Sequence, residues 1–176
     1  MIKFDTTFPP LLAEVLALEY VYEEEDETGI DFEPYAKFQS PKETKAWIVA
    51  WTGNKKLAGA EYRLFGMDGT GGQAAIWIAR PGEDLLAQPI VFFGSEGELG
   101  VVANDFADYL WLLAEGIGPM EAVGYGADDS EPNEQFADFA KTHAPDAKKS
   151  GAEVLARVKE AFPTFEDDFV ALCRHD

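Results

Sequence analysis

Residues 89–119 read PIVFFGSEGELGVVANDFADYLWLLAEGIGP and combine two short apolar runs with a strongly periodic one. The run at 90–93 consists of β-branched and aromatic residues and is too short for a helix, which favours a strand. Residues 94–98 follow it and contain glycines, which tolerate positive φ, so the chain can turn there. These features predict a β-hairpin in which 99–103 is the returning strand.

A helix is predicted directly after this hairpin. Asn104 or Asp105 can cap its N-terminus, because a short polar side chain accepts hydrogen bonds from the first backbone amides. Glycine and proline at 116–119 end it. Its apolar residues recur every three or four positions and therefore share one face, which consists of Phe106, Tyr109, Leu110 and Leu113.

The rest of the chain supplies further helices and one more hairpin. Ser40 and Glu43 form a capping box around Pro41, which predicts a helix from there to about Gly53. The other predicted elements are a helix from Pro9 or Pro10 to about Tyr20, strands at 57–67 and 74–80, and helices at 131–143, 151–162 and about 165–172. We therefore predict a single α+β domain over residues 1–176, with a mainly antiparallel four-stranded sheet packed by N-terminal, central and C-terminal helices.

The helix after Ser40 carries two tryptophans on one face. Ala46, Trp47, Ala50 and Trp51 fall at helical spacing. Such a face is typical of core packing, and the alternative is a site on which a sugar or a base stacks.

The charge balance is strongly acidic and limits the classes of partner. The formal net charge is −19, from 14 lysines and arginines against 33 aspartates and glutamates. Nucleic acid and anionic membranes would be repelled, whereas a basic protein would be attracted. The alternative reading of the same charge is plain solubility.

The sequence also indicates a compartment. A single cysteine, Cys173, excludes an intramolecular disulfide framework and fits a reducing environment. Glu14 and Glu19 interrupt the apolar run near the N-terminus, so it is not a convincing signal peptide. No apolar stretch has the length of a membrane-spanning helix. We expect a cytoplasmic protein.

Patterns that would indicate catalysis, a cofactor or a metal are weak. The glycine-rich stretch 66–72 lacks the lysine of a phosphate-binding loop and is followed by a predicted strand, which favours a hairpin turn. Only two histidines, His143 and His175, are available for imidazole chemistry. We therefore expect no enzyme, no cofactor and no metal site. A pair of acidic residues acting as general acid and base stays open as an alternative, because the sequence does not locate one among so many carboxylates.

A family resemblance rests on two stretches of this sequence. They are LFGMDGTGGQAAIWIAR at 64–80 and the strand, turn, strand and helix pattern PIVFFGSEGE…VVANDFADYLWLLA from 89 onward. Together they resemble the signature region of the SUKH superfamily, which includes bacterial immunity proteins and a fungal regulator of cell-wall assembly. The resemblance covers about residues 40–119. It implies a protein-binding module without catalytic activity, and often an immunity protein that neutralises a toxin such as a nuclease.

The acidic segments are the predicted contacts with a basic toxin domain. The run at 22–34 contains no basic residue, so we expect an exposed, mobile loop, and its alternative reading is a solvated connector. The contact residues proposed from the sequence are Glu23, Glu24, Glu25, Asp26, Glu27, Asp31, Glu33, Asp128, Asp129 and Glu131. The alternative functions are a regulatory or scaffolding domain that binds a cellular protein, and a carboxylate hydrolase.

Overall fold

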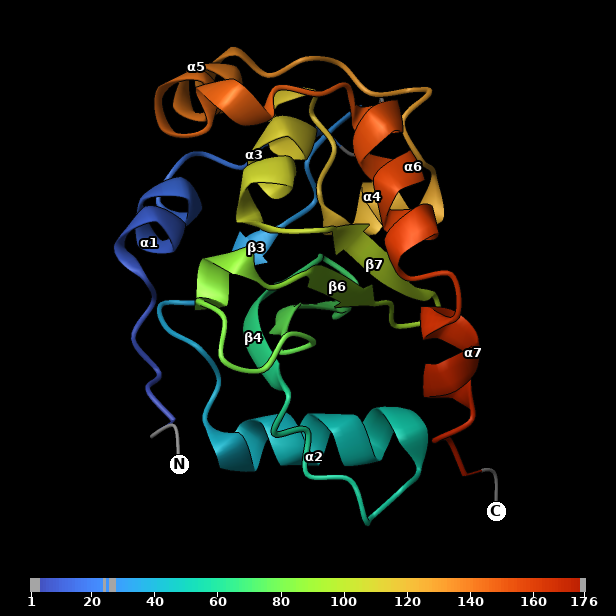
Figure 1. The fold of residues 1–176 in the computed structure, drawn as a ribbon. Coiled ribbons are helices and arrows are strands. Elements are labelled where there is room, and N and C mark those ends of the chain that lie inside the picture. Colours follow the sequence, from blue (N-terminus) through green and yellow to red (C-terminus); the bar gives the residue numbers. More distant parts are fainter. Residues whose placement is uncertain (1–3, 24, 26–27, 175–176) are drawn as a thin grey trace.

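The computed structural model describes residues 4–23, 25 and 28–174. Its main sheet has five antiparallel strands in the order β3-β4-β5-β6-β7 (Figure 1). The strands are β3 (Glu33–Pro34), β4 (Tyr62–Met67), β5 (Gln73–Trp77), β6 (Ile90–Phe93) and β7 (Leu99–Ala103). The α+β class and the hairpin at 90–103 are confirmed. The predicted number of four strands is wrong, because the short strand β3 adds to the edge of β4.

The described part of the acidic N-terminal run contains short strands, which the sequence did not predict. It holds β1 (Tyr22–Glu23) and β2 (Thr28–Gly29), which pair antiparallel, and then β3. The amide of Ile30 donates to the carbonyl of Val21 over 2.9 Å. Ile30 and Phe32 are both buried, so two apolar side chains anchor a segment whose charges alone suggested a mobile loop. Glu24, Asp26 and Glu27 lie outside the described residues.

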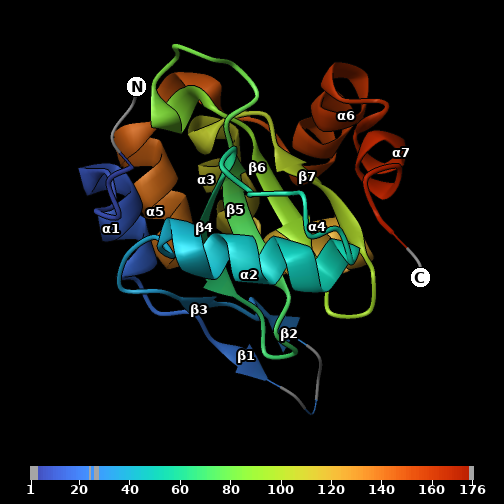
Figure 2. The same ribbon diagram turned by 90° about the horizontal axis from the view of Figure 1, so that it is seen from below.

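Helices cover both faces of the sheet (Figures 1 and 2). On β6, Ile90 and Phe92 point into one core, shared with α1 (Pro10–Leu16), α3 (Phe106–Ala114) and α5 (Glu134–His143). Val91 and Phe93 point into the other, shared with α2 (Pro41–Thr52) and α7 (Phe165–Val170). Because successive side chains alternate between two buried faces, β6 and β7 contain no polar residue.

The helix termini agree with the predicted caps. Ser40 and Glu43 form the capping box at the start of α2, and Gly53 ends that helix with a φ of 67°. Asp105 caps α3 by accepting from the amide of Asp108. Helix α3 is buried on nearly all sides, beyond its predicted face, because α5 and α6 (Gly151–Ala161) pack on it as well as the sheet.

Several elements are shorter than the sequence suggested. The predicted strand at 74–80 is β5 at Gln73–Trp77, and the predicted helix at 131–143 begins at Glu134. Helix α1 ends at Leu16, and the chain then turns so that the hydroxyl of Tyr20 donates to the carbonyl of Val15. Strand β4 begins at Tyr62 because Gly59, with a φ of 67°, makes a turn just before it.

The outer edge of β7 is covered by three helices. Helix α6 lies along it and contributes Val154 to one core and Val158 to the other. Helix α7 and α4 (Pro119–Gly124) flank it, and α4 was not singled out by the sequence. The short 3-10 turns are at Leu85–Ala87 and Pro145–Ala147. Across the described ranges, no helix is both long and apolar enough to pass through a bilayer.

Candidate functional site

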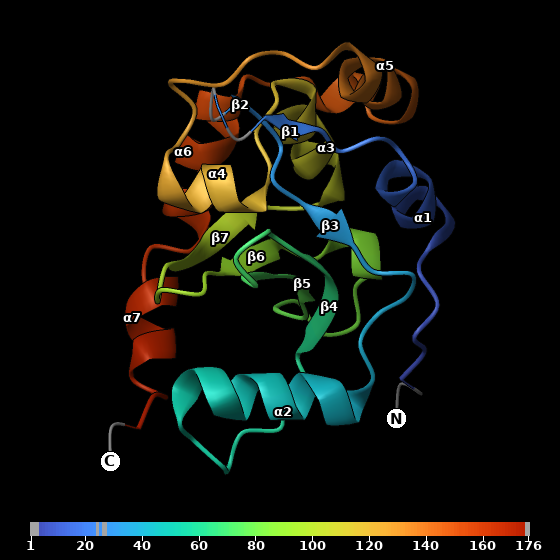
Figure 3. The same cartoon turned by 180° about the vertical axis from the view of Figure 1, so that it is seen from behind.

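The fold brings the two predicted acidic segments together. The β1-β2 hairpin lies beside α4 and the loop that follows α4 (Figure 3). They surround a hollow of about 140 Å³, here called the hairpin hollow. Its lining includes Tyr22, Gly29, Glu121, Tyr125, Asp129 and Glu131. Residues that are more than 90 positions apart in sequence thus share one surface, which we call the acidic end: the β1-β2 hairpin, α4, the loop 125–131 and the turn 94–98.

Not every predicted contact residue belongs to this surface. Glu23, Asp128 and Asp129 are exposed on it. Asp31 has a structural role instead, because its Oδ1 accepts from the amide of Gly69 over 2.9 Å. Glu33 is exposed on β3, at the opposite edge of the sheet from β7.

The carboxylates of the loop after α4 are not used by the fold. Those of Asp128, Asp129 and Glu131 form no ion pair with any residue in the described ranges. By contrast Asp108, whose side chain is 2% exposed, lies 3.0 Å from Lys149 Nζ and 3.2 Å from Arg157 Nε. The Arg157 contact lacks hydrogen-bond geometry, so we regard it as an ion pair. Asp108 ties α3 to α6, whereas the loop carboxylates face solvent.

Tyr125 is the functional candidate that the sequence analysis missed. Its side chain is 72% exposed, more than any other large apolar residue in the described part of the chain. It lies at the meeting point of the hairpin hollow and two further hollows. The sequence did contain a signal of its exposure. Tyr125 lies between two glycines in a polar loop and belongs to no apolar helix or strand face that would bury it.

The largest of these hollows is a groove of about 520 Å³ between α4 and the α6 and α7 helices, here called the helix groove, and its accessible lining is about half polar and half apolar. Its apolar lining includes Val101, Val123, Leu155, Val158, Phe162 and Phe165. Glu166, Asp167 and Lys159 are the charged residues that line it. Carboxylates therefore outnumber bases in a groove that also presents apolar side chains.

The third hollow, of about 300 Å³, also has Tyr125 in its lining and is called the turn hollow. Glu96 and Glu98 of the β6-β7 turn line it, together with Thr70 from the β4-β5 turn. Both glutamates are exposed.

The glycine-rich turn between β4 and β5 is closed by its own aspartate. Asp68 Oδ1 accepts from the amides of Thr70 and Gly72, over 2.9 and 2.8 Å. The Gly69 amide is held by Asp31. Amides that would face a bound phosphate are thus occupied, and the predicted hairpin turn is confirmed.

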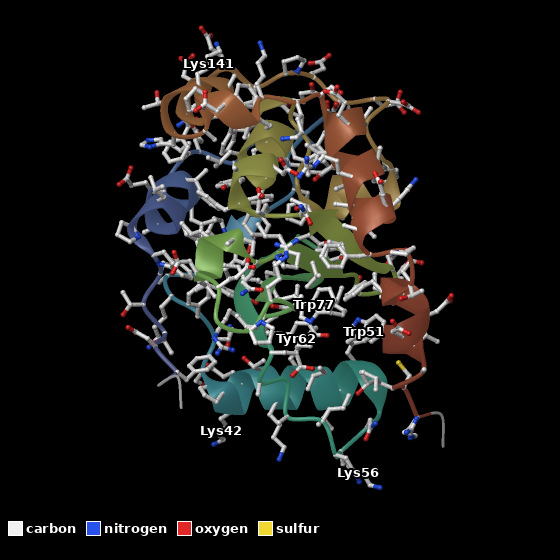
Figure 4. All side chains as sticks on the ribbon, viewed as in Figure 1. Lys42, Trp51, Lys56, Tyr62, Trp77 and Lys141 are labelled. Atoms are coloured by element: carbon white, nitrogen blue, oxygen red, sulfur yellow. The ribbon has the colours of Figure 1, made fainter. Side chains whose placement is uncertain are left out.

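Basic residues are segregated from the acidic end. Lysine, arginine and histidine are absent from 4–36 and from 81–140 of the sequence. These stretches supply all the segments of the acidic end. Figure 4 shows Lys42 and Lys56 at the α2 end of the molecule and Lys141 on α5. The exposed carboxylates of the acidic end therefore have little local neutralisation.

Glu121 is the titratable group with the most unusual environment at this end. Its Oε1 accepts from the amide of Asp31 over 2.9 Å, while its Oε2 is buried without a hydrogen-bond partner in the described ranges. Burial raises its pKa to about 7, and the charge of Asp31 adds to the effect. A raised carboxyl pKa is a property of general acids. Here the carboxyl braces α4 against the segment after β2, which favours a structural role.

The tryptophans of α2 pack into the core beneath the sheet. Trp47 and Trp51 both contact Phe93 edge to face, with ring centroids 4.9 and 5.8 Å apart. Trp51 Nε1 donates to the carbonyl of Gly94 over 3.0 Å. Figure 4 shows Trp51 and Tyr62 between α2 and the sheet. Core packing is confirmed for the two tryptophans, which are partly buried against the core. Ala46 and Ala50 of the same predicted face are exposed, and Ile48 is the apolar residue of α2 that is fully buried.

Metal ligands do not gather in the described ranges. No group of three or more His, Cys, Asp or Glu side chains there could hold a metal ion. Cys173 is a free, partly exposed thiol, and His175 lies outside the described residues.

Comparison with known proteins identifies no relative of this chain. No family model, no curated protein and no solved structure matches the chain.

Proposed function

We propose that this chain is a non-catalytic protein-binding module of the SUKH type that holds a basic protein partner at the acidic end. The observation that carries the proposal is the convergence of the β1-β2 hairpin, α4 and the loop 125–131, none of which contains a basic residue, around the hairpin hollow. The resemblance at 40–119 points in the same direction, because it implies a binding module.

Electrostatics explains how such a surface works. Unpaired carboxylates repel one another, and this repulsion decreases when cations of a partner approach them. Their combined field also accelerates encounter, and salt weakens it because the screening length is about 10 Å at roughly 0.1 M salt. Asp128, Asp129 and Glu131 are exposed and available for this role.

A toxin nuclease is the partner class that fits best. A nuclease must present basic side chains to hold phosphates, so an acidic inhibitor is steered to the same surface that nucleic acid uses. Occupying that surface blocks the substrate without any chemistry by the inhibitor. We therefore propose immunity against a nuclease-type toxin in the cytoplasm.

Affinity capture at two salt concentrations tests this function. The intact chain is used as bait beside a variant that combines Asp128→Asn, Asp129→Asn and Glu131→Gln. A matched variant combines Glu83→Gln, Asp84→Asn and Glu160→Gln, which removes the same charge from exposed positions outside the acidic end. We expect a basic protein that the intact chain and the matched variant retain at low salt, and that the acidic-end variant loses.

Assays with the purified partner then separate the candidate roles. If the partner cleaves nucleic acid and the chain inhibits the cleavage, immunity is supported. A basic partner without such activity supports the scaffolding role instead. Equal loss of the partner by both charge variants, or capture that salt does not weaken, contradicts the acidic end as the binding surface.

A further inference from the structure

We propose that Tyr125 is the aromatic anchor of the partner interface, and that the helix groove beside it receives apolar side chains of a basic partner segment. This inference rests on the proposed function and deepens it, since it names the residue and the groove that the partner contacts. The acidic segments alone do not indicate either one.

The backbone presents Tyr125 in a defined position. The amides of Tyr125 and Gly126 both donate to the carbonyl of Glu121 over 2.9 Å, which pins the turn to the end of α4. Gly126 has a φ of 78°, which a side chain would strain. The flanking glycines leave the ring unshielded, and it is 72% exposed. The hydrogen bonds to Glu121 fix the backbone, and a tyrosine side chain has only two torsions to order on binding, so it loses little conformational entropy. Tyrosines are accordingly frequent hot spots.

The helix groove presents apolar side chains next to the Tyr125 ring. Its volume of about 520 Å³ falls within the range of roughly 300–1,000 Å³ that is usual for binding pockets. Val123 and Phe162 are among its partly buried apolar lining residues, and Gly100 and Val101 of β7 also line it. An apolar side chain placed there would cover surface that now contacts water.

The charges around the ring select the partner. Asp129 and Glu131 line the hairpin hollow, and Glu96 and Glu98 line the turn hollow. In the helix groove, Glu166 and Asp167 outnumber the single base, Lys159. Lysine or arginine side chains that flank an apolar residue would therefore find carboxylates in all three hollows. Nucleic acid and a second copy of this chain would both be repelled, because the net charge is −19. The occupant is therefore a basic protein segment with apolar residues between its cations.

The test is an NMR titration of the isotopically labelled full chain at low salt. The probe is the synthetic peptide Lys-Leu-Lys-Lys-Leu-Lys, and a peptide with glutamate in place of lysine is the charge control. We expect the basic peptide to cause the largest chemical-shift changes at Tyr125, α4 and the helix groove. The control peptide should cause no chemical-shift changes. Tyr125→Ala should lower the affinity for the basic peptide at least about tenfold, whereas Tyr125→Phe should keep most of that affinity.

Val170→Ala provides the matched variant. Val170 is also a large apolar residue on the surface, 51% exposed, but the groove it lines contains no charged residue. We expect this substitution to leave peptide affinity unchanged. Unfolding curves of all variants show whether each is folded.

The outcomes distinguish this inference from the proposed function. Two results would overturn the anchor and the groove but keep the acidic binding surface. In the first, Tyr125→Ala binds the peptide with wild-type affinity and the binding is sensitive to salt. In the second, salt-sensitive binding changes chemical shifts evenly over the acidic surface. Shift changes centred on α2, or no binding by the basic peptide at low salt, overturn both. Strong binding of the glutamate peptide also overturns both, because it removes the role of charge.

Discussion

The acidic end and the α2 side of this protein both carry aromatic side chains, yet they use them in opposite ways. On the α2 side, Trp47 and Trp51 pack against Phe93, and Lys42 and Lys45 are exposed on the same helix. At the acidic end, Tyr125 stands exposed among unpaired carboxylates. The difference shows that an aromatic residue contributes to stability when other rings surround it, and is available for recognition when charge and hollows surround it.

The largest expected effect would come from truncating an aromatic of the α2 side. Trp51→Ala removes ring contacts with Phe93 and Phe169 and the hydrogen bond to Gly94, so we expect a loss of about 3 kcal/mol in the free energy of unfolding. Urea denaturation measures it. Tyr125→Ala is the comparison and should cost less than about 0.5 kcal/mol. Similar losses for the two variants would break the contrast between the regions.

The second effect contrasts a carboxylate that the fold uses with those at the acidic end. Asp108→Asn leaves Lys149 and Arg157 without their buried counter-charge, and we expect it to cost about 2 to 3 kcal/mol. The expected cost is moderate because both cations keep access to water. Asp129→Asn serves as the control and should unfold at the same urea concentration as the wild type. If Asp108→Asn left the free energy of unfolding unchanged, the ion pairs of Asp108 would not be what holds α6 against α3.

The third effect is a pH dependence that belongs to Glu121. Its pKa of about 7 in the folded protein exceeds the ordinary value of 4.5, so the folded state binds this proton more tightly than the unfolded chain does. Its stabilising contribution is complete below about pH 4.5 and is lost as the pH rises through about 7. Glu121→Gln keeps an acceptor for the Asp31 amide and does not titrate. Relative to wild type, it should therefore gain about 2 kcal/mol between pH 5 and pH 8.

Unfolding free energies measured across this pH range test the assignment. Parallel profiles for Glu121→Gln and wild type would show that Glu121 is not the responsible group.

The smallest expected effect concerns the exposed carboxylates of the loop after α4. Replacing Asp129 and Glu131 by their amides should change the free energy of unfolding by less than about 0.5 kcal/mol, because neither carboxylate is paired in the described ranges. The same variant should lower the association rate of a basic partner and its dependence on salt. A clear loss of stability would show that these charges serve the fold, and the comparison of regions would then need revision.

Local sequence signals predicted much of the secondary structure. The capping box at Ser40, the cap at Asp105 and the hairpin at 90–103 all depend on interactions between residues close in sequence, and each is found as predicted. The fifth strand was missed because β3 has only two residues and pairs with β4 across a segment that contains helix α2. The order of the acidic run was also missed, since Ile30 and Phe32 gain their burial from distant elements.

The candidate site divides in the same way. The acidic segments and the deficit of basic residues are visible in the sequence, because charge is a property of composition. That the segments share one hollow, that Asp31 is tied to Gly69, and that Glu121 is buried follow only from how α4 packs beside the β1-β2 hairpin.

Residue type and near neighbours were enough to predict most of the longer helices and strands, the caps at Ser40 and Asp105, and the sign of the net charge. The short elements β1, β2, β3 and α4, the burial or exposure of each aromatic side chain, and the gathering of the carboxylates depend on the packing of distant segments. Periodicity can show that residues share a face, but only the packing of distant elements decides whether that face meets another ring, as at Trp51, or water, as at Tyr125.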